Sequence, residues 1–177
     1  MTRIFACLAF VLTIAGCAST EIPDTPTELG NFALGHNIAV APDLVKGPLS
    51  REATAEELTD AMKAAMQERF GRYEGDHLYH FGINVSGYVL AQPGVPILFS
   101  PKSALVITVS VWDENTGQKL NEEAMQLTVS ENVSGESFVG SGLTTSREEQ
   151  IANLTFNAAR AVERWLLKNP EWLDFDK

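Results

Sequence analysis

Residues 77–91, HLYHFGINVSGYVLA, alternate between apolar and polar side chains over a long stretch of the chain. In an extended strand, successive side chains point to opposite faces of the sheet, so one of the two alternating sets faces the core. The set that better suits a core is His77, Tyr79, Phe81, Ile83, Val85, Gly87 and Val89. The segment therefore predicts a long β-strand with one buried face.

A short strand is predicted before this segment and two strands after it. Residues 37–42 (NIAVAP) are typical of a short strand ended by Pro42, which cannot donate to a hydrogen-bonded ladder. Residues 104–112 and residues 119–131 alternate in a similar way and are separated by the turn residues 113–117. The residues predicted to face inward are Leu105, Ile107, Val109 and Val111 in the first of these strands and Met125, Leu127 and Val129 in the second.

Two segments carry the signals of amphipathic helices. Thr54 and Glu57 have the spacing of a capping box, in which each side chain satisfies a free backbone amide, and Gly71 ends this helix. The second helix begins after Thr145 or Ser146. Its predicted apolar stripe is Ile151, Leu154, Ala158, Ala161, Val162, Trp165 and Leu166. The residues predicted to pack the tail against the domain are Trp172, Leu173 and Phe175.

The predicted order of elements is β-α-β-β-β-α. Two helices with one apolar stripe each can cover one face of a sheet, and strands that follow one another in a meander pair antiparallel. The sequence therefore predicts an α+β fold, a two-layer sandwich of an antiparallel sheet with both helices on one face. Residues 132–144, which are rich in glycine and serine, are predicted to form a loop.

The N-terminus has the organisation of an export signal. Arg3 is followed by the apolar or neutral run Ile4–Ile14, which is too short to span a bilayer, and the run closes with IAGC (residues 14–17). This pattern resembles the lipobox of bacterial lipoproteins. The resemblance implies cleavage before Cys17 and acyl chains on its sulfur and on the new amino terminus. The alternative is a plain secretory signal that is cut at the small residues.

The lipobox divides the chain into three parts. Residues 1–16 are predicted to be the signal peptide, residues 17–34 the lipidated cysteine and an acidic tether, and residues 35–177 a periplasmic α+β domain. Two or more acyl chains make membrane anchoring stable. Ala18 follows the cysteine where aspartate commonly retains such lipoproteins at the inner membrane. We therefore expect the periplasmic face of the outer membrane, with the inner membrane as the alternative.

The charge and the cysteine content exclude some classes of function. The chain has 13 Lys and Arg against 23 Asp and Glu, a formal net charge of −10. Such a balance argues against binding to nucleic acid, whose affinity comes largely from cationic side chains on phosphates. Cys7 leaves with the signal peptide and Cys17 carries the lipid, so no disulfide is expected.

The sequence contains no familiar catalytic or cofactor motif. It lacks a glycine-rich phosphate loop, a paired-cysteine metal site and a His-Glu-x-x-His motif. His77 and His80 are the closest histidine pair, but positions three apart on a strand face opposite sides, so the rings are not expected to share a metal. Asp113 and Glu114 fall in a turn, where a surface role is expected. We therefore predict no enzyme activity, no metal and no cofactor.

One predicted connection between strands is unusually apolar. Residues 92–101 (QPGVPILFSP) join two strands, where a loop normally faces water, and an exposed apolar segment often marks a contact site. The residues predicted to contact a partner are Val95, Ile97, Leu98 and Phe99. The alternatives are that they cover the open end of the core or touch the membrane. Trp112 is a second candidate for an exposed aromatic, although a place in the core is favoured.

The lipobox, the short tether and the predicted order of elements together resemble small periplasmic lipoproteins of Gram-negative bacteria, some of them alphaproteobacterial and uncharacterised. The nearest group has a domain similar to the N-terminal domain of TolB, and includes lipoprotein activators of penicillin-binding proteins and auxiliary lipoproteins of lipid-transport ABC systems. The resemblance rests on Ile38–Val40, the helix after Thr54, Val109–Asp113 with Thr116-Gly117, and the long closing helix.

This resemblance implies a non-catalytic, membrane-anchored lipoprotein that binds an envelope protein as an accessory subunit of an assembly or transport complex. It carries over no functional residue except Cys17. The alternative, from a different class, is a lipoprotein that binds a lipid or small molecule between sheet and helices. A hydrolase of the envelope is a third and weaker hypothesis.

Overall fold

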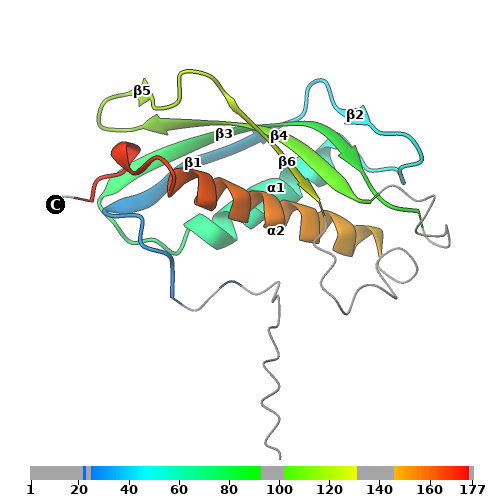
Figure 1. Ribbon diagram of the computed structural model, residues 1–177, viewed down its shortest axis with the longest axis horizontal. Helices are drawn as coiled ribbons and strands as arrows, with labels where there is room; N and C mark the ends of the chain where they lie inside the picture. Colours follow the sequence, from blue (N-terminus) through cyan, green and yellow to red (C-terminus); the bar gives the residue numbers. More distant parts are fainter. Residues whose placement is uncertain (1–21, 23–24, 93–101, 131–145, 176–177) are drawn as a thin grey trace, which may run out of the picture.

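The computed structural model describes residues 22, 25–92, 102–130 and 146–175. They form two layers, a six-stranded sheet and two long helices on the same face of it (Figure 1). In chain order the elements are β1 (Phe32–Val40), β2 (Val45–Lys46), α1 (Ala55–Phe70), β3 (His77–Val89), β4 (Ala104–Asp113), β5 (Gln118–Lys119), β6 (Met125–Ser130), α2 (Arg147–Leu166) and the 3-10 turn η2 (Pro170–Trp172). The predicted two-layer α+β fold is confirmed.

The sheet is mixed, whereas the sequence predicts an antiparallel one. β4 pairs antiparallel with β3, β5 and β6, but β1 and β2 both pair with β3 in parallel. The cause is the position of α1 in the chain. A helix between two neighbouring strands carries the chain back to its starting end, so the second strand runs in the same direction as the first.

β1 is longer than predicted, because it begins at Phe32 and not at residue 37. Its pairing with β3 shifts between Leu34 and Asn37, where β1 contains one extra residue. Such a bulge breaks the alternation of side chains that identifies a strand in sequence. Gly35 lies inside it, and a Cβ atom at Gly35 would lie 2.3 Å from Nδ1 of His80.

The buried face of β3 is correctly predicted over most of its length. Tyr79, Phe81, Ile83 and Val85 all face the helices and are buried. The register then shifts between Val85 and Gly87. Beyond this second bulge the faces exchange, so that Tyr88 is buried in place of the predicted Val89.

The last predicted strand is divided into two. β4 buries its four predicted residues, but residues 119–131 form the short β5 and the separate β6. Asn121 lies between them and is buried: its Oδ1 accepts a bond from Val111 N at 2.9 Å, and its Nδ2 donates to Val109 O at 3.0 Å. The Asn121 side chain thus makes the hydrogen bonds to β4 that the backbone of a neighbouring strand would otherwise make. Met125, predicted to face inward, is exposed at the start of β6.

Both helices begin with a capping box. Thr54 and Glu57 form the first, and Ser146 and Glu149 form the second, which resolves the predicted choice of Thr145 or Ser146. Six of the seven residues of the predicted α2 stripe are buried, and Ala161 is partly buried. In the tail, Leu173 is buried and Trp172 packs against the core, whereas the exposed Phe175 does not fit the prediction. Residues 132–144 lie outside the described part.

The two helices run parallel to each other, and ionic contacts join them at both ends. At the start, the Arg147 guanidinium donates to both carboxylate oxygens of Glu57, at 2.9 and 2.5 Å. This contact, together with the backbone N–H of Thr54, lowers the pKa of Glu57 to about 2. Near their C-terminal ends, Arg69 of α1 pairs with Glu163 of α2.

The Arg69–Glu163 pair is buried between the helices. Arg69 Nη1 lies 2.9 Å from Glu163 Oε2, and both residues are at most 5% exposed. The Tyr73 hydroxyl donates to the other carboxylate oxygen at 3.0 Å, and the guanidinium lies over the Phe156 ring at 5.0 Å from its centre. Both oxygens of the carboxylate are thereby bonded, so the charge is compensated inside the core.

Removing one member of this pair is expected to cost more than removing both. Glu163→Ala leaves the charge of Arg69 buried without its partner, and should lower the free energy of unfolding by about 3 to 5 kcal/mol. The double variant Arg69→Met/Glu163→Leu fills similar volume without charge and should lose much less. Urea unfolding followed by circular dichroism measures both, and an equal loss in the two variants would contradict the expectation.

Candidate functional site

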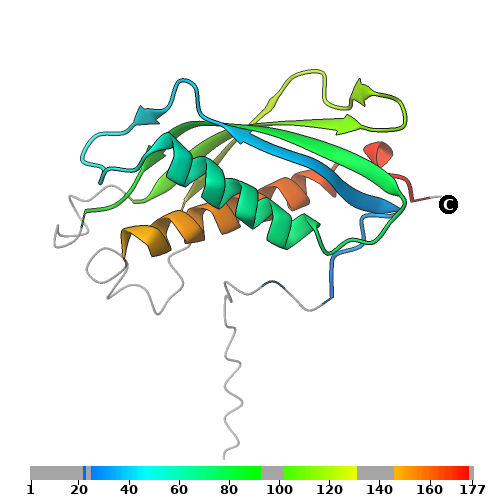
Figure 2. The same cartoon turned by 180° about the vertical axis from the view of Figure 1, so that it is seen from behind.

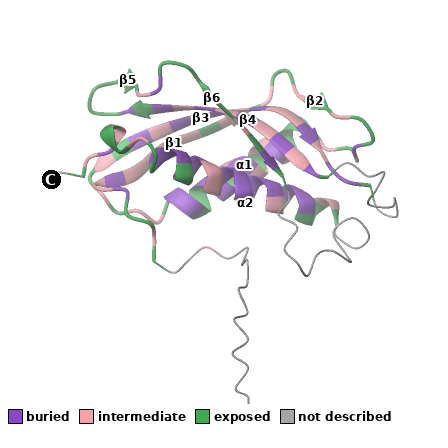
Figure 3. Cartoon of the chain, in the orientation of Figure 1, coloured by how far each residue is buried: buried purple, intermediate pink, exposed green. Residues whose placement is uncertain are grey.

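The face of the sheet opposite the helices carries exposed apolar side chains. Buried residues concentrate between the sheet and the helices (Figure 3). Ile38 and Val40 of β1 lie opposite Gly82 and Asn84 of β3, the residues that alternate with its buried set. Both therefore project from this outer face, and Ile38 is 58% and Val40 48% exposed.

Trp112 lies on the same outer face, and not in the core as predicted. It is opposite His80 and is 36% exposed. A Cβ atom at Gly82 would lie 3.0 Å from Cζ3 of Trp112, so the indole covers the glycine that is paired with Ile38. Ile38, Val40 and Trp112 are called the outer apolar patch below.

Polar groups border this patch at the start of β3. The His80 ring stacks on His36, with 4.8 Å between ring centres. Its Nδ1 accepts a hydrogen bond from the backbone N–H of His36 at 2.7 Å, and its Nε2 lies 2.5 Å from Oε2 of Glu114. This arrangement needs the tautomer with the proton on Nε2, so both nitrogens of His80 already have partners.

His77 forms a separate cluster with the C-terminal tail. Its Nε2 lies 2.7 Å from Asp113 Oδ1 and its Nδ1 lies 3.7 Å from Asp174 Oδ2. The backbone of Asp174 accepts from Asn31 N at 2.7 Å and donates to the Tyr79 hydroxyl at 3.2 Å. The cluster therefore fastens the tail to the start of β1 and β3.

Asp113 is buried, which differs from the surface role that its turn position predicts. Burial raises the pKa of its carboxyl, but hydrogen bonds from His77, Asn115 and Thr116 outweigh burial, and the pKa is lower than the usual 3.8. A carboxylate with a lowered pKa stabilises the fold above that usual value, and the contribution is lost as pH falls.

His77 and His80 belong to two separate clusters. They use different acids, Asp113 with Asp174 for one and Glu114 for the other. Among residues 22, 25–92, 102–130 and 146–175, no group of three or more His, Cys, Asp or Glu could hold a metal ion. The geometry of both clusters serves to join segments of the chain.

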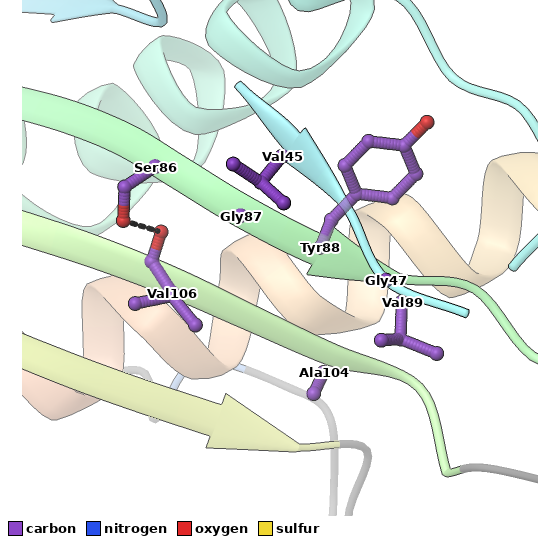
Figure 4. A pocket seen from close by; sticks show the side chains of 8 residues that line it. All are labelled: Val45, Gly47, Ser86, Gly87, Tyr88, Val89, Ala104 and Val106. Atoms are coloured by element: carbon purple, nitrogen blue, oxygen red, sulfur yellow. Dashed lines mark hydrogen bonds between the residues drawn. The ribbon is translucent and has the colours of Figure 1, made fainter. Parts of the chain in front are cut away.

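A shallow apolar groove lies further along the outer face, at the end of β3 (Figure 4). Its volume is about 320 Å³. It is lined by Val45, Gly47, Ser86, Gly87, Tyr88, Val89, Ala104 and Val106. The Tyr88 hydroxyl is engaged elsewhere, since it donates to Ala53 O at 3.0 Å, so the groove offers mainly apolar contact. With the outer apolar patch, it makes this face the best candidate for binding.

The sites predicted from sequence lie outside the described residues. These are the lipidation site Cys17 and the contact segment with Val95, Ile97, Leu98 and Phe99. Both stay predictions. The outer apolar patch was not predicted as a unit, because its members come from two separate strands, β1 and β4, that only their pairing with β3 brings together. The exposed alternation of Ile38 and Val40 is the one signal that was present in sequence.

Comparison with protein-family models gave no match, and comparison with curated protein sequences gave no significant match. Among solved structures, the chain is similar to protein XCC0632 of Xanthomonas campestris, from family DUF330, with a TM-score of 0.50 and 13% identity over 85% of this chain and 91% of that one. The sequence identity is low, so this similarity shows the fold alone.

Two other solved structures are more distant. One is PelC from Paraburkholderia phytofirmans, a dodecamer, with a TM-score of 0.40 and 8% identity over 75% of this chain and 89% of that one. The other is a minor lipoprotein from Acinetobacter baumannii, with a TM-score of 0.31 and 15% identity over 75% and 96%. The TolB-like resemblance stays a prediction. None of the helices in the described residues has the length and apolar character needed to cross a membrane.

The Asp113 cluster predicts a loss of stability in acid. Asp113→Asn should lower the free energy of unfolding at neutral pH by about 1.5 to 3 kcal/mol, because hydrogen bonds to a charged group are lost. Stability of the unmodified protein should fall as pH drops below the usual pKa of aspartate, 3.8, and this fall should be smaller in the variant. Thermal unfolding between pH 7 and pH 3 measures both the loss at neutral pH and the fall in acid. Asp43→Asn, in an exposed turn, is the control. Identical pH profiles in all three proteins would contradict the assignment.

Proposed function

We propose that this chain is a non-catalytic lipoprotein of the bacterial envelope, anchored through Cys17 at the periplasmic face of the outer membrane. In this proposal its α+β domain binds a partner protein as an accessory subunit of an assembly or transport complex. The observation that carries the proposal is the exposure of Ile38, Val40 and Trp112 on a sheet face that the helices leave uncovered. Apolar side chains gathered on one face often mark a contact site.

The outer face supports binding better than chemistry. Each histidine on β3 is paired with an acid and fixed by a neighbouring segment, so neither is placed as a free base. The groove is apolar and shallow, which suits an aliphatic side chain of a partner. The contact segment predicted at Val95, Ile97, Leu98 and Phe99 connects β3 to β4 in the chain, just beyond the groove residues Val89 and Ala104, and belongs to the same proposal.

The alternative function, a lipid or small molecule held between sheet and helices, has less support. The space between the layers is filled by large side chains that are at most 1% exposed. At one end of it the Phe32 ring stacks on Tyr79 at 5.0 Å and lies 5.8 Å from Phe70. The groove that could take an apolar ligand lies on the other face of the sheet.

The lipid anchor is tested with a pair of cysteine variants. Cys17→Ser should abolish acylation, so that the mature N-terminus with its acyl chains disappears from the intact mass spectrum. Cys7→Ser changes a residue in the predicted signal peptide and should leave that species unchanged. Purified protein from both strains is compared by mass spectrometry, and a Cys17→Ser protein that still carries acyl chains would exclude the anchor.

Partner binding is tested by photo-crosslinking in living cells. A benzophenone amino acid at position 112 should give one dominant crosslinked envelope protein, while the same probe at Leu167, an exposed residue just past α2, should not. The double variant Ile38→Asp/Val40→Asp should remove the crosslink and keep the circular dichroism spectrum. Equal products from both probe positions, or none, would count against the proposed function.

A further inference from the structure

We propose that the free edge of β1 binds an extended segment of the partner protein as an added β-strand, through backbone hydrogen bonds at Asn37 and Ala39. This inference rests on the proposed function and names the place and the chemistry of the contact. Strand addition to an open sheet edge is a common way to bind a peptide, because the backbone supplies affinity and alternate side chains supply specificity.

β1 forms one border of the sheet. In the described residues, its strand partner is β3 on one side, and on the other side the single bridge of Ala33 with Glu74 covers only its beginning. α1 lies below β1 and not beside it, as Figure 2 shows, and the Asn37 side chain donates to Lys63 O of this helix at 2.9 Å. No strand among the described residues pairs with the outer edge from Asn37 to Val40, which is therefore open.

The hydrogen-bond pattern shows which backbone groups point to this edge. Asn31 O accepts from His77 N in β3 at 3.0 Å, whereas Phe32 O points the other way and accepts from Gly75 N at 2.9 Å. Phe32 and Asn37 are paired with His77 and Phe81, which lie four residues apart on β3. Backbone groups on a strand alternate between its two edges, so Asn37 and Ala39 point outward as Phe32 does.

The sequence of β1 lacks the usual protection of an edge strand. Natural edge strands carry lysine, proline or inward-pointing charges that prevent pairing with another chain. The nine residues FALGHNIAV contain no charged residue and no proline, and the bulge lies before Asn37. The four residues Asn37–Val40 thus offer a regular and uncharged ladder.

The side chains next to this edge indicate which residue types the added strand contains. Ile38 and Val40 project from the outer face and are about half exposed, so they can pair with apolar side chains at alternate positions of the new strand. The chain carries a net charge of −10, which favours cationic residues on either side of that apolar segment. The occupant is therefore an extended segment with alternating aliphatic residues and basic flanks, supplied by another protein.

The test uses a synthetic peptide and the purified full chain in detergent. The probe is the peptide KTVTVTVK, and its fully N-methylated form keeps the side chains but lacks backbone donors. Hydrogen exchange followed by mass spectrometry should show slower exchange in residues 32–40 with the first peptide and no change with the second. The acidic peptide ETVTVTVE should bind about tenfold more weakly, a difference of about 1.4 kcal/mol.

Ala39→Pro is the decisive variant. Proline removes the outward N–H of this edge residue. The backbone groups that bond β1 to β3 are unchanged, and so are the side chains of the outer apolar patch. In this variant the peptide should no longer slow hydrogen exchange in residues 32–40. The thermal unfolding midpoint should stay close to that of the unmodified protein. Ala39→Val keeps the N–H and should bind.

Three results with the peptide would overturn the inference. These are no protection by KTVTVTVK, equal binding by Ala39→Pro and Ala39→Val, or protection of β1 by self-association that the peptide does not displace, which would make a second copy the occupant. A crosslink at position 112 that persists in the Ala39→Pro variant would contradict binding at the β1 edge, but it would not contradict the proposed function.

Discussion

The backbone pairing of β3 is the constraint on which the rest of the structure depends. This strand bonds to β1 and β2 along one edge and to β4 along the other, so every other part of the sheet is placed relative to it. Its buried face, from Tyr79 to Val85, belongs to one hydrophobic core with buried residues of both helices. Its other face has small or polar residues at Gly82, Asn84 and Ser86, and these leave room for side chains from neighbouring strands.

The two helices cover only one face of the sheet. α1 and α2 lie parallel, with their N-termini joined by Arg147 and Glu57 and their later turns joined by Arg69 and Glu163. Parallel helix dipoles bring like ends together, and acids in the first turn of each helix with an arginine in the last turn reduce this repulsion. Because both helices use the same sheet face, the apolar residues on the opposite face stay exposed.

Sequence patterns were sufficient where one local rule determines the structure. The first capping box, the stripe of α2 and the buried face of β4 followed from spacing alone, because each depends on residues close together in the chain. Patterns failed where an added residue shifts the alternation, at Leu34 to Asn37 and at Val85 to Gly87. They also failed at Asn121, whose side chain takes the place of a backbone partner.

The candidate site was harder to predict than the fold, because it depends on contacts between distant segments. Trp112 follows the buried Val111, so alternation along β4 places it on the outer face, where its indole covers Gly82, the glycine paired with Ile38. His36 had no recognisable partner in sequence, yet it stacks on His80, 44 residues away. Pairings of this kind depend on the register between neighbouring strands, which no local pattern encodes.

The bond between Asn31 N and Asp174 O brings the entry and the exit of the domain to one end of the sheet. In the proposed lipid-anchored protein, the chain that follows Cys17 enters the domain at that end. β3 extends away from it over 13 residues, a length of about 40 Å. In that proposed form, a fluorescent protein fused to the C-terminus would lie at the end of the sheet where the tether enters, whereas one inserted at the far end of β3 would lie away from it.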